Sequence, residues 1–261
     1  RRSLAGSAAI SIKNVILYKE FHLPNGPGVA TSVERAEGCA RSVALTLEAI
    51  ARPMLTYPHF QPHFPREMWV LPKILEHQAV ARADRPCLSW TDAGKAMTFA
   101  DVNAKVNRIA HGLIAAGIGK GDKVVLYMPN SLEFVLIWFA LTKVGAVEVP
   151  VGEMQKGAFL EHQLKVSQAR TIITTADLLP RLTEVAGNVE RLKRCYLLSG
   201  ADKVAKGVLG KVEVRAVSDL ETTNDSNPGI ALTPEDEAAV LYTSGTTGMS
   251  KGVLMLHSHF Y

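Results

Sequence analysis

Residues 238–256 read AAVLYTSGTTGMSKGVLML and are the most informative stretch of the chain. The apolar runs Ala238–Tyr242 and Val253–Leu256 predict two strands, because short apolar runs bounded by turn residues are typical of buried strands. Between them, residues 243–252 form a glycine-rich loop with several hydroxyl side chains, Lys251 and no acidic residue. Glycine lets backbone N–H groups converge on an anion, and an ammonium group suits phosphate oxygens. The glycine-rich loop is therefore predicted to bind a polyphosphate.

Two other interpretations of this loop fit the sequence less well. The phosphate-binding loop of many kinases and GTPases reads Gly-x-x-x-x-Gly-Lys-Ser/Thr and opens a helix. Here Ser250 precedes the lysine, Gly252 follows it, and the next residues predict a strand. A plain hairpin turn needs only two to five residues, and the glycine-rich loop is about twice that length. A phosphate-binding loop of a different type is favoured.

Upstream of this loop, helical and strand patterns alternate, which implies βαβ units. Thr98 and Ser131 are expected to cap helices at their N-termini, and Gly117 and Gly145 are expected to end them. The polar segment 218–234 is predicted to be a surface loop. The predicted helices are 70–83, 99–116, 131–144, 159–168 and one that ends near 189, and the predicted strands are 87–90, 123–128, 146–151, 170–175, 195–198 and 212–217. These patterns predict an α/β fold with mainly parallel sheets flanked by helices.

The first 64 residues differ from the rest of the chain. They carry seven basic and four acidic side chains, against 22 and 21 in residues 65–261. Helical spacing of apolar residues predicts a helix over residues 33–51, and four prolines between residues 53 and 65 exclude regular structure there. We expect residues 1–64 to be an extension or linker without an assigned role, ahead of a domain over residues 65–261.

The composition is that of a globular protein and excludes several classes of function. The 261 residues have 47% hydrophobic and 21% charged side chains, with a net charge of +4. Proteins that bind nucleic acids gather basic residues on one face. Because basic and acidic residues are balanced beyond residue 64, no nucleic-acid partner is expected. The longest apolar run, Phe134–Leu141, is far shorter than the ~20 residues that cross a membrane, so no integral membrane segment is expected.

The cysteines indicate a compartment. Cys39, Cys87 and Cys195 are odd in number and far apart in the sequence. This usage excludes a disulfide framework and fits a reducing environment, so a cytoplasmic location is expected. The sequence indicates no oligomeric state.

Several motifs together resemble those of the adenylate-forming (AMP-binding) superfamily. Residues 243–253, TSGTTGMSKGV, are similar to its phosphate-loop signature, Ser/Thr-Ser-Gly-Thr-Thr-Gly-x-Pro-Lys-Gly-Val, with Ser250 in place of the usual proline. We expect this change to loosen the loop slightly and to remove no phosphate donor. Residues 97–151 look like the first core region of the family, with Lys-Gly-Asp at 120–122, Pro-Asn-Ser at 129–131 and Lys-x-Gly-Ala-Val-x-Val-Pro at 143–150. The resemblance covers about Trp69–Tyr261.

This resemblance implies a particular fold and extent. Residues 65–261 would be the front part of the large N-terminal domain of the adenylate-forming fold, with the C-terminal domain absent. The chain starts with Arg1 rather than Met and stops at Tyr261 within a patterned segment, so we expect an N-terminal fragment of a longer protein. The adenylate pocket, the hinge and the main catalytic lysine of the family would lie beyond Tyr261. This chain alone is therefore expected not to catalyse adenylation.

Within the superfamily, the sequence looks most like acyl-CoA ligases, and among them like carnitine/crotonobetaine-type and fatty acid ligases. The resemblance implies that a small carboxylic acid reacts with ATP to give an acyl-adenylate and pyrophosphate, and then with coenzyme A to give a thioester. Mg²⁺ would bridge the phosphates of ATP, and no residue of this chain is expected to bind a metal directly. Lys251 would stabilise charge on the terminal phosphates, and His257 matches a histidine that is usual in the family. The other cofactor-binding residues that the resemblance implies are Thr243, Ser244, Gly245, Thr246, Thr247 and Gly248.

Two alternative functions stay open at this point. In the first alternative, the protein is an adenylation domain that loads a carrier protein. In the second, it is a truncated, non-catalytic fragment that binds nucleotide weakly. Dependence on a phosphopantetheine carrier identifies the first alternative. A gene that ends at the codon for Tyr261 favours the second.

Overall fold

The computed structural model describes residues 7–12, 15–20, 62–90, 95–243 and 249–261. The predicted helix over residues 33–51 lies outside the described residues, and so do residues 244–248 of the glycine-rich loop.

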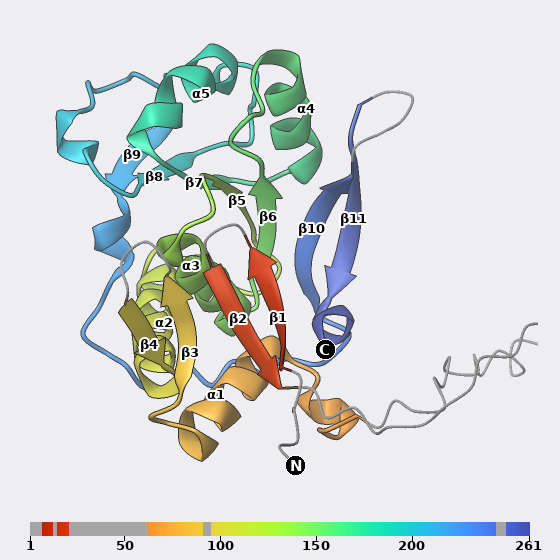
Figure 1. Cartoon of the computed structure of the whole chain (residues 1–261). Coiled ribbons are helices and arrows are strands. Elements are labelled where there is room, and N and C mark those ends of the chain that lie inside the picture. Colours follow the sequence, from red (N-terminus) through yellow and green to blue (C-terminus); the bar gives the residue numbers. More distant parts are fainter. Residues whose placement is uncertain (1–6, 13–14, 21–61, 91–94, 244–248) are drawn as a thin grey trace, which may run out of the picture.

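A seven-stranded sheet forms the centre of the fold (Figure 1). The strands lie in the order β11-β10-β6-β5-β7-β8-β9, and every neighbouring pair is parallel except the β10–β11 hairpin at one edge. The predicted α/β fold with a mainly parallel sheet is confirmed, and each predicted strand of this sheet is present to within two residues. The strands are β5 Lys123–Tyr127, β6 Val147–Val151, β7 Thr171–Thr174, β8 Arg194–Leu197, β9 Glu213–Ala216, β10 Glu237–Thr243 and β11 Lys251–Leu256.

Helices cover both faces of this sheet (Figure 1). One face packs against α1 (Leu71–Ala81), α2 (Phe99–Ala115) and α3 (Leu132–Lys143). The other face packs against α4 (Gly157–Ser167) and α5 (Leu179–Ala186). The shorter 3-10 helices are η2 Arg66–Met68, η3 Ala176–Leu178, η4 Ala201–Lys203, η5 Val217–Leu220 and η6 His257–Phe260.

The apolar side chains of the buried strands explain why helices pack on both faces of the sheet. In β5, Val124 and Leu126 pack in the core beneath α1–α3, whereas Val125 and Tyr127 pack in the core beneath α4 and α5. Successive side chains of a strand point to opposite faces, so a strand that is apolar at every position requires helices on both sides. The ends of these central strands stay uncovered by the helices, as far as the described residues show.

The predicted helix boundaries rest on local hydrogen bonds that the structure contains. Thr98 Oγ1 accepts from the Asp101 backbone N–H at 3.1 Å, and Asp101 Oδ2 accepts from the Thr98 N–H at 3.2 Å, which completes a capping box for α2. Ser131 Oγ accepts from the N–H of Phe134 at 3.0 Å and caps α3. Gly145 follows α3 with φ of +72°, a conformation that glycine adopts without strain.

A second, antiparallel sheet joins segments that are far apart in the sequence. It has the order β1-β2-β3-β4, formed by Ser7–Ile12, Val15–Glu20, Pro86–Trp90 and Lys95–Thr98. The predicted strand 87–90 is confirmed as β3, whereas β4 was not predicted. Strands β1 and β2 belong to the segment that we expected to be an extension or linker, and β2 pairs with β3.

The segment 218–234 is more firmly attached than a surface loop. Its Leu220 and Leu232 are buried. A Cβ added to Gly112 of α2 would lie 1.7 Å from the Leu220 carbonyl oxygen, so this segment runs directly against the α2 backbone. Asn107 of α2 donates to the Asp225 carbonyl at 2.7 Å. The prediction missed this packing because the apolar residues are isolated within a polar stretch.

Candidate functional site

The β10–β11 hairpin carries the glycine-rich loop. Its register ends with Thr243 opposite Lys251, and the Thr243 hydroxyl donates to the Lys251 carbonyl at 3.5 Å. Both residues are exposed. The structure therefore brings together the first and the last of the predicted phosphate-binding residues. The others lie outside the described residues: Ser244, Gly245, Thr246, Thr247 and Gly248.

The position of the hairpin suits a binding loop. Strand β10 runs parallel to β6, with Ala239 opposite Glu148, and the glycine-rich loop follows the carboxyl end of β10. Open α/β sheets bind ligands outside the carboxyl ends of their strands. The loop therefore lies at the edge of the sheet where ligands generally bind.

Helix α4 holds both ends of the glycine-rich loop. Before the loop, the Tyr242 hydroxyl donates to the Gln163 carbonyl at 2.7 Å. Near the end of the loop, Gln163 Nε2 donates to Ser250 Oγ at 3.0 Å, and His162 Nε2 lies 3.0 Å from the Ser250 carbonyl oxygen. Burial raises the pKa of Tyr242 to about 12, so its hydroxyl stays a donor at neutral pH. Figure 1 shows α4 beside the upper end of the hairpin.

Ser250 occupies the position where the resembling signature has proline, and it is held by a side-chain hydrogen bond. Proline would fix φ of the backbone, whereas the serine hydroxyl is held by a hydrogen bond from the buried Gln163. Sequence reasoning missed Gln163 and His162, which lie 87 and 88 residues from Ser250. The only signal was the departure itself, because a hydroxyl in that place can accept a hydrogen bond.

The hairpin also requires a glycine directly after Lys251. A Cβ on Gly252 would lie 2.8 Å from Val240 Cγ1 across the hairpin, which is closer than packed carbon atoms approach. A larger residue at this position would therefore require the Val240 side chain to move.

Lys251 is the cation that the hairpin presents. Its side chain is exposed, and it makes no ion pair with any of the residues that the structure describes. The glycine-rich loop contains no acidic residue to neutralise it. An anion bound at the loop would therefore meet an uncompensated positive charge.

His257 lies at the other end of β11. It follows Lys251 by six residues, which on a strand is a separation of about 20 Å. Its side chain is buried, its backbone N–H donates to the Asp236 carbonyl at 3.0 Å, and neither ring nitrogen has a hydrogen-bond partner among the described residues. Burial lowers its pKa to about 4, so the ring is neutral. The structure does not bring His257 to the glycine-rich loop.

The described part of the chain offers neither a metal site nor a membrane span. It contains no group of three or more His, Cys, Asp or Glu side chains that could hold a metal ion. None of its helices has the length and apolar character needed to cross a membrane.

Comparisons with known proteins give a consistent result. A family model described as "AMP-binding enzyme" matches residues 75–261. The chain is 29% identical over 218 residues to 4-coumarate-CoA ligase 1 of Narcissus pseudonarcissus, which covers 83% of this chain and 37% of that protein. It is 33% identical over 163 residues to crotonobetaine/carnitine–CoA ligase of Salmonella paratyphi A, which covers 61% of this chain and 30% of that protein.

The structure is also similar to solved structures of CoA ligases. The anthranilate CoA ligase AuaEII, solved in complex with anthranoyl-AMP, superimposes with a TM-score of 0.63 at 26% identity. That match covers 76% of this chain and 36% of the solved chain. The chain thus spans about a third of the length of the relatives that it matches.

Proposed function

The chain belongs to the AMP-binding enzyme family, and from this premise we propose that it forms part of an ATP-dependent ligase that joins a carboxylic acid to coenzyme A. The relatives named above are all CoA ligases by their printed names, which supports coenzyme A rather than a carrier protein as the acceptor. Because the chain spans 30–37% of these relatives, the proposal concerns a longer protein that contains it. Within the chain, we assign residues 65–261 to the AMP-binding domain.

The proposed reaction has two steps. In the first, a carboxylate oxygen of the acid attacks the α-phosphorus of ATP, the bond to the β-phosphate oxygen breaks, and an acyl-adenylate and pyrophosphate form. In the second, the coenzyme A thiolate attacks the acyl carbonyl carbon, and AMP leaves with the electron pair of the broken bond. Negative charge grows on pyrophosphate during the first step, and donors already in place stabilise such charge.

The glycine-rich loop supplies these donors in the proposal. Lys251 contacts the terminal phosphates, and the loop donates from backbone N–H groups and hydroxyls. The observation that carries this assignment is the attachment of the loop to α4 on both sides, through Tyr242 and Ser250, while Lys251 stays exposed and unpaired among the described residues. A loop fixed at both ends loses little entropy when phosphate binds. The other donors are Thr243, Ser244, Gly245, Thr246, Thr247 and Gly248.

Two further groups have defined places in this proposal. In this proposal Mg²⁺ would accompany ATP and offset part of the phosphate charge, and no step depends on a protein-bound ion. His257 contacts no phosphate, because β11 separates it from Lys251. Cys87 and Cys195 are buried and free, which fits a cytoplasmic location.

Acid-dependent exchange between ATP and labelled pyrophosphate tests this function in the whole protein. The acids to compare are 4-coumarate, anthranilate, carnitine, crotonobetaine and fatty acids of increasing chain length, since the relatives' names point to both aromatic and aliphatic acids. We expect one class of acid to stimulate exchange and to yield a CoA thioester when coenzyme A is added. Exchange with no acid, or thioester formed only on a phosphopantetheine carrier, would contradict the proposal.

A further inference from the structure

A second charged region lies at the opposite edge of the seven-stranded sheet. A pocket of about 300 Å³ is lined by residues at and just before the starts of β5, β7 and β8. The starts of these strands lie side by side, with Val124 opposite Thr171 and Thr171 opposite Arg194. The pocket is therefore at the amino-terminal edge of the sheet, whereas the glycine-rich loop follows the carboxyl end of β10. We call it the basic pocket, after its lining residues Lys123, Arg170, Arg191 and Arg194.

The positive charge in the basic pocket is not neutralised within the described part of the chain. None of its four cationic side chains makes an ion pair there. One carboxylate, that of Asp122, also lines the pocket and offsets one of the four positive charges, so a net positive charge remains. An arginine cannot relieve repulsion by losing its proton, since the guanidinium stays charged at any physiological pH. The cluster therefore keeps its charge and attracts anions.

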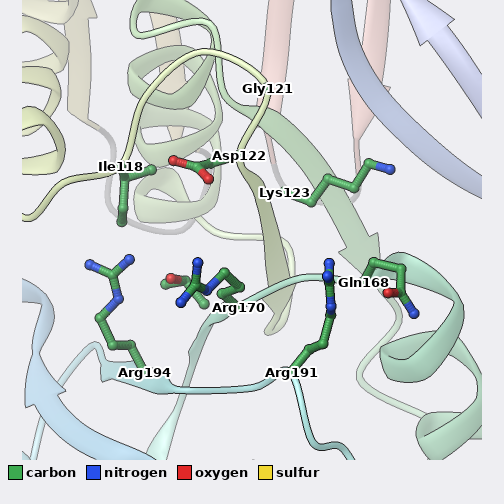
Figure 2. Close-up of a pocket in the computed structure, with 9 residues that line it drawn as sticks. Ile118, Gly121, Asp122, Lys123, Gln168, Arg170, Arg191 and Arg194 are labelled. Atoms are coloured by element: carbon green, nitrogen blue, oxygen red, sulfur yellow. The ribbon is translucent and has the colours of Figure 1, made fainter.

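The backbone that carries these side chains is fixed. The Arg170 carbonyl accepts from the N–H of Lys193 at 2.9 Å and from the N–H of Arg194 at 3.1 Å, which ties two walls of the pocket together. Arg194 Nη1 donates to the Ala116 carbonyl at the end of α2. Figure 2 shows the guanidinium groups of Arg170, Arg191 and Arg194 directed into the pocket, with the Asp122 carboxylate on the facing side. The cations thus converge from separate segments onto one space.

We propose that the basic pocket binds a small anion that carries two or more phosphate groups, either free or attached to a nucleoside. Its volume lies at the lower end of the range for small-molecule sites, which is about 300–1,000 Å³. A pocket of this size is about as wide as the Debye length at physiological salt, about 8 Å, so the fields of its cations overlap inside it. One guanidinium group can donate two parallel hydrogen bonds to two oxygens of a phosphate, which favours phosphate over a simple halide.

Pyrophosphate binding by the whole protein tests this proposal. Calorimetric titrations use inorganic pyrophosphate, inorganic phosphate and ADP at about 0.15 M salt, in a Lys251→Ala background that weakens binding at the glycine-rich loop. The test variant is the double substitution Arg170→Gln with Arg191→Gln, since both side chains are exposed. The matched control is Lys206→Gln with Lys211→Gln, which removes the same charge from exposed positions outside the pocket. Thermal unfolding without ligand checks that both variants fold.

The proposal predicts a specific pattern. The pocket variant weakens pyrophosphate binding by about tenfold or more, because two charge-assisted contacts are lost, and the control changes it by less than about twofold. Inorganic phosphate binds more weakly than pyrophosphate. Preference for ADP over pyrophosphate identifies a nucleotide ligand, and the reverse identifies a free inorganic anion. Equal weakening by the pocket and control variants, or unchanged binding by the pocket variant, overturns the proposal.

Discussion

The two charged edges of the seven-stranded sheet are built on different principles. At the carboxyl-terminal edge, one continuous segment supplies glycines, hydroxyl groups and a single lysine, and helix α4 fixes its two ends. At the amino-terminal edge, four cationic side chains come from separate segments and meet in a pocket. In our proposals, the loop binds phosphate mainly through backbone groups around one charge, and the pocket binds an anion through charged side chains.

The two kinds of binding group suit different tasks. Backbone N–H groups in a fixed loop need no rearrangement when charge develops, which is what a phosphoryl-transfer step requires. Long arginine side chains must be ordered when a ligand binds, so they suit reversible binding better than catalysis. The predictions below test this division between the edges.

The largest expected effect concerns the 261-residue chain by itself. The basic pocket is lined by residues of this chain, whereas we propose that the glycine-rich loop is one part of a nucleotide site in a longer protein. We expect the isolated chain to show no acid-dependent ATP–pyrophosphate exchange and to keep pyrophosphate binding at the basic pocket. Exchange at a rate similar to that of the whole protein would break the comparison, because the loop would then need no further domain.

The next effect concerns the attachment of the loop to α4. Gln163→Ala removes the hydrogen bond to Ser250 Oγ, which is worth about 1 kcal/mol, so adenylate formation should fall roughly fivefold to tenfold. Pyrophosphate binding at the basic pocket should stay unchanged, because Gln163 does not line it.

A double-mutant cycle separates positioning from general destabilisation. In a Ser250→Ala background, Gln163→Ala should cause little further loss in the rate of exchange, because the shared hydrogen bond is already absent. Additive losses from the two substitutions would show that Gln163 acts on the fold rather than on the loop.

The next effect concerns stability rather than rate, in strand β6 of the same sheet. Burial raises the pKa of Glu148 in β6 to about 8, from an ordinary value of 4.5. The folded state therefore keeps a proton that the unfolded chain loses. Its contribution to the free energy of unfolding is complete below pH 4.5. It declines by about 1.4 kcal/mol per pH unit as the pH rises to about 8. Glu148→Gln should raise the melting temperature over that of the wild type at pH 8 more than at pH 5. An equal difference at both pH values would contradict a buried, protonated Glu148.

A second effect on stability has the opposite pH dependence. Burial lowers the pKa of His257 from 6.5 to about 4. The stability that comes from the neutral ring is full above pH 6.5 and is lost as pH falls towards 4, because the unfolded chain then takes up a proton first. When the pH is lowered from 7 to 5, the melting temperature of His257→Gln should therefore fall less than that of the wild type. The KM for ATP should stay unchanged. A raised KM for ATP would place His257 at the glycine-rich loop after all.

Much of the fold was predictable because its signals are local. Thr98 and Ser131 mark the starts of helices through their own hydroxyls, and Gly145 marks an end through its positive φ. The alternation of strands and helices then implies a parallel sheet. The packing of Leu220 against Gly112 was not predictable, because the two residues are distant in the sequence. Strand β4 was missed because its four residues, Lys95–Thr98, are too short a run to show a clear pattern.

The sites at the two edges of the sheet also differ in how far the sequence predicts them. The glycine-rich loop was found from the sequence because its groups are contiguous between Thr243 and Gly252. Gln163 was missed because its role exists only once α4 lies beside the hairpin. The basic pocket had no sequence signal at all, since Lys123 and Arg194 meet only through the pairing of β5, β7 and β8.

The most direct test of the central claim is the effect of Lys251→Ala on each half-reaction of the whole protein, with the exposed Lys206→Ala as control. If the glycine-rich loop stabilises charge on departing pyrophosphate, ATP–pyrophosphate exchange falls by about 100-fold or more. Thioester formation from preformed acyl-adenylate and coenzyme A then stays near the wild-type rate, and the control leaves both steps unchanged. Equal losses in the two half-reactions, or exchange at the wild-type rate, would contradict the assignment of this loop to the phosphates of ATP.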